Sequence, residues 1–191
     1  HVDIVEMLLD EGADVNQPTT DDGSTPLFAA SHNGHTDIVA MLLGKGGDVN
    51  QPTTDIGSTP LYAASQHGHA DVVEMLLNKG ADVNQRTTKN RLTSLHAAAL
   101  RGHSKVVKKL LAFGAHAILA SLDRGYTPLY IASSGGHAEI IVEMLLGKGA
   151  DVNQPTTDDG STPLFAASHN GHTDIVAMLL GKGGDVNQPT T

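Results

Sequence analysis

The sequence predicts an all-α solenoid in which helix-turn-helix units stack in a row, with an extended segment containing a turn between successive units. Three observations carry this prediction: a period near 34 residues, two short helical segments in every period, and a low content of aromatic residues. Periods of this length are typical of architectures in which each unit contacts only its neighbours. The 191 residues include three Phe, three Tyr and no Trp, so thin layers of Ala, Leu, Val and Ile must supply the core.

The period is carried by elements that recur along the chain. Thr-Pro-Leu, once in the variant form Thr-Ser-Leu, begins at Thr25, Thr59, Thr93, Thr127 and Thr162. A Gly-His pair begins at Gly34, Gly68, Gly102, Gly136 and Gly171. Successive copies are 34 residues apart, except for one step of 35. We therefore divide the single array 1–191 into a half unit 1–20 and the units 21–54, 55–88, 89–122, 123–157 and 158–191.

Each unit contains the signals for two helices. In the first full unit, Thr25 suits the N-cap and Pro26 the first helical position, and Asn33-Gly34 ends the helix. A second helix from about Thr36 carries the apolar stripe Ile38, Val39, Leu42 and Leu43. That stripe is too wide for one contact, so we expect it to pack on its partner helix and on neighbouring units.

Taken in order, Thr-Pro-Leu, Ala-Ala, Gly-His, Leu-Leu and Gly-Ala-Asp-Val-Asn resemble the ankyrin repeat, and the resemblance covers the whole chain. It implies two antiparallel helices and a protruding β-hairpin per unit, in a gently curved solenoid that binds proteins. The usual ankyrin period is about 33 residues. The extra residue lies between Asn50 and Thr59, so we expect longer hairpin tips. The His that usually follows Thr-Pro-Leu is kept only at His96.

The resemblance also implies where a partner protein binds: at the hairpin tips and the inner faces of the first helices. Aromatic, Arg and apolar side chains that have no other explanation on a surface make the best anchors. They concentrate in the third and fourth full units. The candidate partner-binding residues are Arg91, Leu92, Leu100, Arg101, Arg124, Tyr126, Asn90, Lys89, Ile56 and His67.

Charge is distributed unevenly along the chain. Between Asp82 and Asp123 there are seven basic and no acidic residues, whereas the rest of the chain has five basic and 21 acidic residues. Two explanations stay open. The lysines form a solvated helix face that pairs with acidic neighbours, or the unit 89–122 binds an acidic or phosphorylated partner through the forked donors of Arg91 and Arg101.

Composition argues against several other functions. The net charge of −9 disfavours binding to nucleic acid and to anionic membranes. No apolar run approaches the ~20 residues that a membrane helix needs. The absence of Cys excludes disulfides and thiolate catalysis and fits the cytoplasm. We expect a protein partner, no nucleic acid, no membrane insertion and no cofactor.

The residues that could carry chemistry have structural explanations. We expect the five Gly-His histidines to bond the hairpin backbone, because one per unit is too sparse to share a metal ion. His32-His35 and His169-His172 have weak metal spacing but cross a helix-ending turn, so no metal site is predicted. Asp21-Asp22 and Asp158-Asp159 are expected as solvated charges at hairpin tips, without a pocket to raise a pKa. We therefore predict no catalytic residue and no enzyme.

Two further features of the pattern carry structural predictions. The aromatic column Phe28, Tyr62, Tyr130 and Phe165 is expected to pack between units. The Asn of each Asp-Val-Asn is expected to hold the backbone that leads into the hairpin. The segment Ile140-Ile141-Val142 is one residue longer than its counterpart Val72-Val73, so we expect a π-bulge or a shifted helix start.

The two ends of the chain raise questions about its origin and context. Residues 12–54 and 149–191 are identical at all 43 positions, which favours natural duplication over deliberate design. Residues 1–11 form the second helix of a unit whose first helix is absent. We expect either that the array continues on both sides or that the chain self-associates end to end. Besides a dedicated binding module, the alternatives are a scaffolding or targeting arm of a larger enzyme, channel or receptor, and an engineered scaffold without a dedicated ligand.

Overall fold

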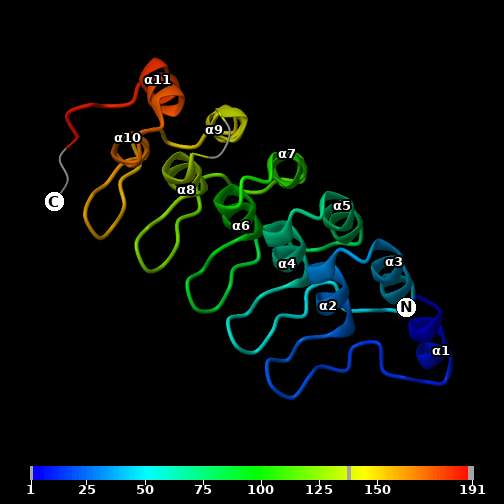
Figure 1. Ribbon diagram of the computed structural model, residues 1–191. Helices are drawn as coiled ribbons and strands as arrows, with labels where there is room; N and C mark the ends of the chain where they lie inside the picture. The colour runs from blue at the N-terminus through cyan, green and yellow to red at the C-terminus, as the bar shows by residue number, and fades with distance from the viewer. Residues whose placement is uncertain (1, 137–138, 189–191) are drawn as a thin grey trace.

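The computed structural model describes residues 2–136 and 139–188, and within them it contains eleven helices and no strand. Five helix-turn-helix pairs stack in a row behind one unpaired helix, α1 (Val2–Asp10) (Figure 1). The first helices of the pairs are α2 (Pro26–Asn33), α4 (Pro60–His67), α6 (Ser94–Leu100), α8 (Pro128–Gly135) and α10 (Pro163–His169). The second helices are α3 (Thr36–Gly44), α5 (Ala70–Asn78), α7 (Ser104–Ala112), α9 (Glu139–Gly147) and α11 (Thr173–Gly181). This arrangement confirms the predicted all-α repeat solenoid.

The first helix of each unit begins at the predicted threonine. In α2 the Thr25 hydroxyl accepts a hydrogen bond from the Phe28 amide at 3.1 Å, and Pro26 occupies the first helical turn. This arrangement satisfies one otherwise free N–H and places proline where no donor is needed. The local sequence is therefore sufficient to explain where these helices start.

The Gly-His pair joins neighbouring units. Gly34 has φ +72°, and a Cβ built on it would lie 2.5 Å from the imidazole of His69 in the next unit. The Nε2–H of His69 donates to the carbonyl of His32 at 3.0 Å, in the last turn of the preceding first helix. His103 and His172 make the same contact with Gln66 and Ser134. The predicted bond to the hairpin backbone is therefore wrong: these histidines bond the exposed carbonyls at the ends of the first helices.

The Asn of Asp-Val-Asn forms a second bridge between units. The Asn50 side chain donates to the carbonyl of Gly80 at 3.3 Å and accepts from the amide of Asp82 at 2.8 Å. Gly80 and Asp82 follow α5 and lead into the next hairpin, so the predicted role of this Asn is confirmed, and it reaches across the unit boundary. Equivalent amide bridges are made by Asn16, Asn84 and Asn153.

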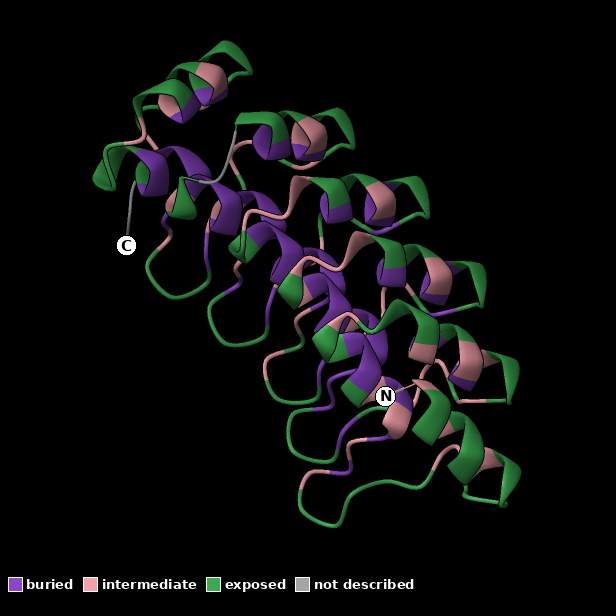
Figure 2. Cartoon of the chain, turned by 45° about the vertical axis from the view of Figure 1, so that its right-hand side comes forward, coloured by how far each residue is buried: buried purple, intermediate pink, exposed green. Residues whose placement is uncertain are grey.

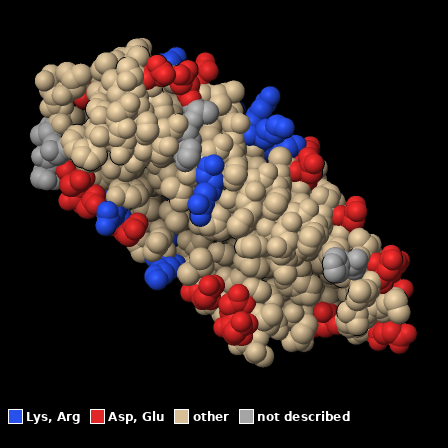
Figure 3. All heavy atoms as spheres, in the orientation of Figure 1, with Lys and Arg blue, Asp and Glu red and all other residues tan. Residues whose placement is uncertain are grey.

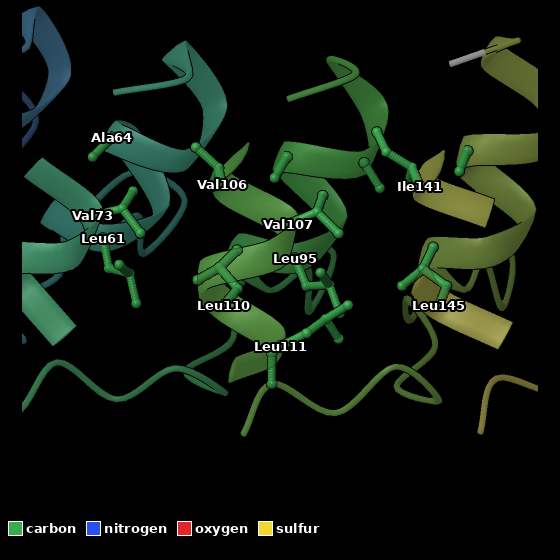
Figure 4. Packing of buried hydrophobic residues seen from close by; sticks show 14 of the residues in the cluster. Leu61, Ala64, Val73, Leu95, Val106, Val107, Leu110, Leu111, Ile141 and Leu145 are labelled. Atoms are coloured by element: carbon green, nitrogen blue, oxygen red, sulfur yellow. The ribbon is translucent and has the colours of Figure 1, made fainter. Parts of the chain in front are cut away.

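The hydrophobic core runs along the array between the two rows of helices. Val107 and Leu110 of α7 pack beside Leu95 of α6, and Leu145 of α9 continues the layer (Figure 4). The first helices are largely buried, whereas the hairpin tips and the outer faces of the second helices are exposed (Figure 2). The wide apolar stripe of the second helices thus contacts both its partner and the adjacent units, as predicted.

The extra residue in unit 123–157 is absorbed before α9. This helix has nine residues, like α5, and Ile141 and Val142 occupy the buried positions of Val72 and Val73. The alternative of a shifted helix start is therefore correct, and no π-helical turn occurs in α9. His137, expected to repeat the Gly-His contact, lies outside the described residues.

Five hairpin loops protrude on one side of the array: 16–25, 50–59, 84–93, 118–127 and 153–162 (Figure 1). Each is closed near its base; in one, the Thr53 amide donates to the Ser58 carbonyl at 2.9 Å. Neighbouring loops are also linked, since the Thr54 amide donates to the Asp22 carbonyl at 2.8 Å. The same link is made by Thr88, Leu122 and Thr157. The loops therefore form a hydrogen-bonded row without assembling into strands in the described parts of the chain.

Both ends of the described array expose apolar side chains. They are Ile4, Met7 and Leu8 at one end and Phe165, Leu180 and Val186 at the other. End-to-end association through these faces stays a prediction. None of the helices within the described ranges combines the length and apolar character needed to cross a membrane.

Candidate functional site

A groove of about 370 Å³ lies between two neighbouring hairpin loops and the first helices that follow them. The loops are 84–93 and 118–127, and the helices are α6 and α8. It is a concave surface built from two units, on the side of the array that the sequence analysis assigned to partner binding. Its lining residues are Asn90, Leu92, Leu100, Ser121, Asp123, Tyr126, Tyr130, Ile131, Ser134 and Gly135.

The groove exists because these two units depart from the repeat pattern at inward-facing positions. Leu92 and Tyr126 stand where the other three loops have serine, at Ser24, Ser58 and Ser161. Ile131 stands where the other first helices have alanine. Gly135 provides no side chain where the equivalent helices carry Asn33, His67, Arg101 and Asn170. Large apolar walls and a missing side chain together produce an apolar hollow that the regular units lack.

One wall of the groove is a pair of tyrosines. The rings of Tyr126 and Tyr130 stack with centroids 4.7 Å apart and planes inclined by 15°. Partial burial raises the pKa of Tyr130 above its ordinary value, so its hydroxyl remains protonated at neutral pH. Tyr130 was assigned to packing between units, but it also lines this groove.

Arg124 braces the outer side of that wall. Its guanidinium donates to the Tyr126 hydroxyl at 3.1 Å and lies 5.9 Å from the centre of the Tyr126 ring. Its Nε is also 3.7 Å from the Asp158 carboxylate in the next loop. Arg124 therefore orients an aromatic wall of the groove, and its charge is partly neutralised.

A buried histidine positions the same wall from below. His96 is almost fully buried in α6, and its Nε2–H donates to the Tyr126 carbonyl at 3.1 Å. Its Nδ1 accepts from the Thr93 amide at 3.1 Å, which fixes the ring. Burial lowers the pKa of His96 to about 4, so the ring is neutral at physiological pH.

The sequence-predicted site residues divide into three groups. Asn90, Leu92, Leu100 and Tyr126 line the groove, as does Ser134 on the inner face of a first helix, where the resemblance placed partner contacts. Lys89, Arg91 and Arg101 are exposed and adjoin it in sequence, and Arg124 supports its wall. Ile56 and His67 belong to the preceding unit and do not line it.

Five lining residues were missed by the sequence analysis as contact residues. Ile131 could have been found, because it interrupts a column of alanines. Gly135 and Ser121 could not, since a small residue signals nothing until its larger neighbours are placed around it. The complete set is Ser121, Asp123, Tyr130, Ile131 and Gly135.

The basic residues of unit 89–122 do not form one patch. Lys and Arg side chains lie in separate groups on the face shown in Figure 3. Lys109, on the outer helix α7, forms an ion pair with Glu74 of α5. Pairing with acidic neighbours thus explains Lys109. The arginines of the hairpin loop and of the end of α6 belong to a different surface, beside the groove.

Arg86 and Arg91 shape the loop that borders the groove. Arg86 stands where three of the four other loops have proline, and its Nε donates to the Arg91 carbonyl at 2.9 Å. Its guanidinium also donates to the carbonyl of Ala120 in the next loop. Arg91 has φ +54°, the single positive φ of a non-glycine residue in the described chain, where the equivalent loops use glycine. This conformation costs an L-residue about 1–2 kcal/mol, and such strain concentrates at functional sites.

Three histidines lie close together at the ends of α2 and α4, in the first two full units. The rings of His67 and His32 have centroids 4.1 Å apart, and His69 lies 6.1 Å from His67. Burial and neighbouring basic groups lower the pKa of His67. Within the described ranges, no group of three or more metal-binding side chains is found.

One member of each acidic pair at the hairpin loops, Asp22 or Asp159, is held ionised by hydrogen bonds. The Thr19 and Ser24 hydroxyls donate to the Asp22 carboxylate at 2.6 and 2.7 Å. These hydrogen bonds lower the pKa of Asp22 to about 2. Asp159 in the identical copy behaves alike, with a pKa of about 2. A carboxylate with so low a pKa cannot act as a general acid at neutral pH, so these groups serve loop geometry.

Comparison with known proteins gives one family. A family model described as ankyrin repeats (3 copies) matches the chain over residues 1–87, 52–121 and 95–190. No curated protein matches the sequence.

Proposed function

Because the chain belongs to the ankyrin repeat family, whose members are generally protein-protein interaction modules, we propose that it binds a partner protein through the groove between units 89–122 and 123–157. The family is typically non-enzymatic. The partner contacts the hairpin loops and first helices around the groove and presents acidic or phosphorylated groups to its basic border.

The observation that carries this proposal is the groove itself. Leu100 is 50% exposed on an inner helix face, and Leu92 and Tyr126 replace serines of the regular loops. Exposed apolar side chains around a hollow are energetically unfavourable in water and are typical of binding surfaces. Aromatic and arginine residues beside such a hollow are the usual energetic centres of protein interfaces.

Affinity capture with matched variants tests the proposal. The chain is immobilised, bound proteins are taken from a cell lysate, and their amounts are quantified by mass spectrometry. We expect Leu100→Asp to reduce capture of the specific partner by about tenfold or more, because it places a charge in the apolar contact. The control is Leu180→Asp, since Leu180 is 43% exposed but lies at the end of the array.

Charge reversals provide the second comparison. Arg101→Glu is expected to weaken capture, whereas Lys182→Glu is expected to leave it unchanged. Lys45 is a poorer control, because it forms an ion pair with Asp10 at 2.9 Å. If the partner still binds the Leu100→Asp and Arg101→Glu variants but is lost from the control variants, the binding surface lies elsewhere on the chain.

The proposal includes a scaffolding or targeting role in the cytoplasm. Such a role needs no chemistry from the chain and uses the same surface. It is tested by whether the captured partner and the chain occur in the same cell fraction.

A further inference from the structure

Two exposed arginines directly adjoin lining residues of the groove in the sequence, one before α6 and one after it. Arg91 lies in the loop before α6, and Arg101 directly follows the last residue of that helix. The two arginines are separated by Leu92, Thr93 and the seven residues of α6, and the helix alone spans about 10 Å at ~1.5 Å per residue. Between them, Leu92 and Leu100 form one apolar side of the groove.

These two guanidinium groups are available to a partner. Both side chains are exposed, and neither forms an ion pair with an acidic group in the described part of the chain. Arg86 and Arg124 are engaged, the first with two loop carbonyls and the second with Tyr126, whereas Lys89 is exposed in the same loop as Arg91. The cationic positions at the groove are therefore few and well separated.

The strained backbone conformation of Arg91 is a second argument that its charge has a role in binding. Glycine would satisfy the same turn without strain, as it does in the other loops, where Gly23, Gly57, Gly125 and Gly160 have φ values of +70° to +72°. An arginine here adds a charge beside an apolar groove at the expense of stability. Strain of this kind persists where the surrounding structure, here the Arg86 bond to the Arg91 carbonyl, holds the conformation.

We infer that the groove binds an extended acidic segment of the partner, in which one large apolar or aromatic side chain lies between two carboxylates. This inference rests on the proposed function and deepens it. The apolar side chain enters between Leu92, Leu100 and the Tyr126–Tyr130 stack. One carboxylate pairs with Arg91 and the other with Arg101. An extended chain rises ~3.3 Å per residue, so a span of about 10 Å or more places the two acidic residues roughly three or more positions apart.

The dimensions favour one large anchor. A volume of about 370 Å³ is at the small end of ligand sites, which run from ~300 to 1,000 Å³. It therefore accommodates one bulky side chain and leaves the flanking residues at the borders. Those borders are where the two arginines lie.

The separation of the arginines favours two carboxylates over one phosphate. A phosphate group binds best when several donors converge on it. Arg91 and Arg101 stand at opposite ends of α6, so each is placed to bind a charged group of its own. Two single charges, each bound by one guanidinium, match this spacing.

An acidic residue that lines the groove restricts where the carboxylates of the partner can lie. Asp123 lines the groove on the side of the second loop. Its carboxylate repels an acidic group placed directly above it, so the carboxylates of the partner must lie at the ends of the groove. Removing this charge in Asp123→Asn should tighten binding of the acidic segment.

The test is a selection from a displayed library of random dodecapeptides on the folded chain, with counter-selection against the Leu100→Asp variant. We expect enrichment of peptides with Trp, Phe, Leu or Tyr between two acidic residues. An enriched peptide carrying Trp is then titrated by fluorescence. The chain contains no Trp, so the shift of the emission to shorter wavelength reports burial of the peptide side chain alone.

Single substitutions then test which charged side chains of the groove contact the peptide. Arg91→Gln and Arg101→Gln should each weaken this peptide by about fivefold to tenfold, as expected for one charge-assisted hydrogen bond. Lys182→Gln should change its affinity less than twofold, and Asp123→Asn should strengthen it by about twofold to threefold. Circular dichroism melting curves confirm that each variant is folded.

The outcomes separate this inference from the proposed function. Peptides that depend on Leu100 but lack acidic residues, or that ignore both Arg→Gln variants, overturn the acidic segment and leave the groove as a binding site. Replacing one glutamate by phosphoserine and gaining more than tenfold in affinity would assign a phosphate and overturn the carboxylate pair. Recovery of no Leu100-dependent peptide contradicts the inference and the proposed function together.

Discussion

Two junctions between units show how one repeat pattern serves two purposes. The regular junction joins units 21–54 and 55–88, and the atypical junction joins units 89–122 and 123–157. At the regular junction, the Asn50 amide bridges to Gly80 and Asp82, and His69 bonds the His32 carbonyl. At the atypical junction Ile118 replaces the bridging asparagine and is 64% exposed. There, His96 bonds the carbonyl of Tyr126 instead.

The difference separates what stacking requires from what recognition adds. Both junctions bury the same core columns, with Leu61, Leu95 and Leu129 each fully buried. The polar bridge has moved from the base of the loops at the regular junction to the groove wall at the atypical one. The atypical junction therefore keeps its core but uses its polar contacts to position a binding surface.

A substitution at the Gly-His contact of the regular junction is expected to cause the largest loss of stability. Gly34 has φ +72°, and a Cβ there would lie 2.5 Å from the His69 ring. We expect Gly34→Ala to lower the free energy of unfolding by about 4 kcal/mol, from strain and overpacking together. Gly171 is the matched control, with φ +75° and no atom within 4 Å of its built Cβ. Gly171→Ala should lose only about 1.5 kcal/mol in urea denaturation followed by circular dichroism; equal losses would show that His69 yields at no cost.

The atypical junction is expected to weaken in acid through His96. Its pKa is lowered to about 4 in the folded chain, below the ordinary 6.5, so the unfolded chain binds the proton more readily. The stability from neutral His96 is complete above pH 6.5 and is lost as pH falls through 4, by roughly 3 kcal/mol in total. The measurement is urea denaturation between pH 7 and pH 4 for the wild type and for His96→Phe, which matches the aromatic residue of other units. The extra acid sensitivity of the wild type should vanish in the variant, and identical pH slopes would remove His96 from the junction's energetics.

Exchanging the bridging residue tests whether the amide explains the difference between the junctions. Asn50→Ile removes two hydrogen bonds from the regular junction and should cost about 2 kcal/mol. The reciprocal Ile118→Asn should stabilise the atypical junction by about 1 kcal/mol, because an exposed apolar side chain gives way to a bridging amide. Chemical denaturation of both variants measures this. Destabilisation by Ile118→Asn would show that the backbone after α9 has moved out of reach of the amide.

The smallest expected change in the free energy of unfolding comes from a substitution that should raise stability and weaken binding at the same time. Arg91→Gly relieves the left-handed strain and should raise the free energy of unfolding by about 1 kcal/mol. The same variant should weaken the acidic peptide, because it removes the guanidinium. Lys89→Gly, in the same loop, is the control that loses a charge without relieving strain. If Arg91→Gly changes neither property, the positive φ carries no functional information.

The predictable parts of the fold were those decided within a few residues of chain. Thr25 and Pro26 predicted a helix start, and Gly34 predicted a helix end, because caps and left-handed stops depend on local chemistry. The direction of the Gly-His bond was not predictable, since its acceptor lies 37 residues away, in the preceding unit. The same holds for the shifted start of α9, where packing decided between two local solutions.

The candidate site was predictable only in part for the same reason. Leu92, Leu100 and Tyr126 stood out because they are apolar where the repeat is polar. Gly135 contributes by lacking a side chain, and Asp123 by facing a hollow made by other residues. Those contributions depend on neighbours across the junction, so they cannot be recognised by comparing one repeat position among the units.

The identical segments 12–54 and 149–191 show what the sequence alone determined. Both copies contain a helix of the same nine residues, α3 and α11, preceded by the same histidine. These features coincide because caps, turns and helical hydrogen bonds join residues close in the chain.

Burial, however, differs between the two copies, and only the tertiary structure decided it. Ser31 is fully buried and Val39 is 0% exposed, whereas Ser168 is exposed and Val176 is half-buried. The unit 55–88 covers the first copy, and within the described chain no further helix pair follows the second. Local conformation is set by neighbours within about one helical turn, whereas burial and surface are set by the unit stacked alongside.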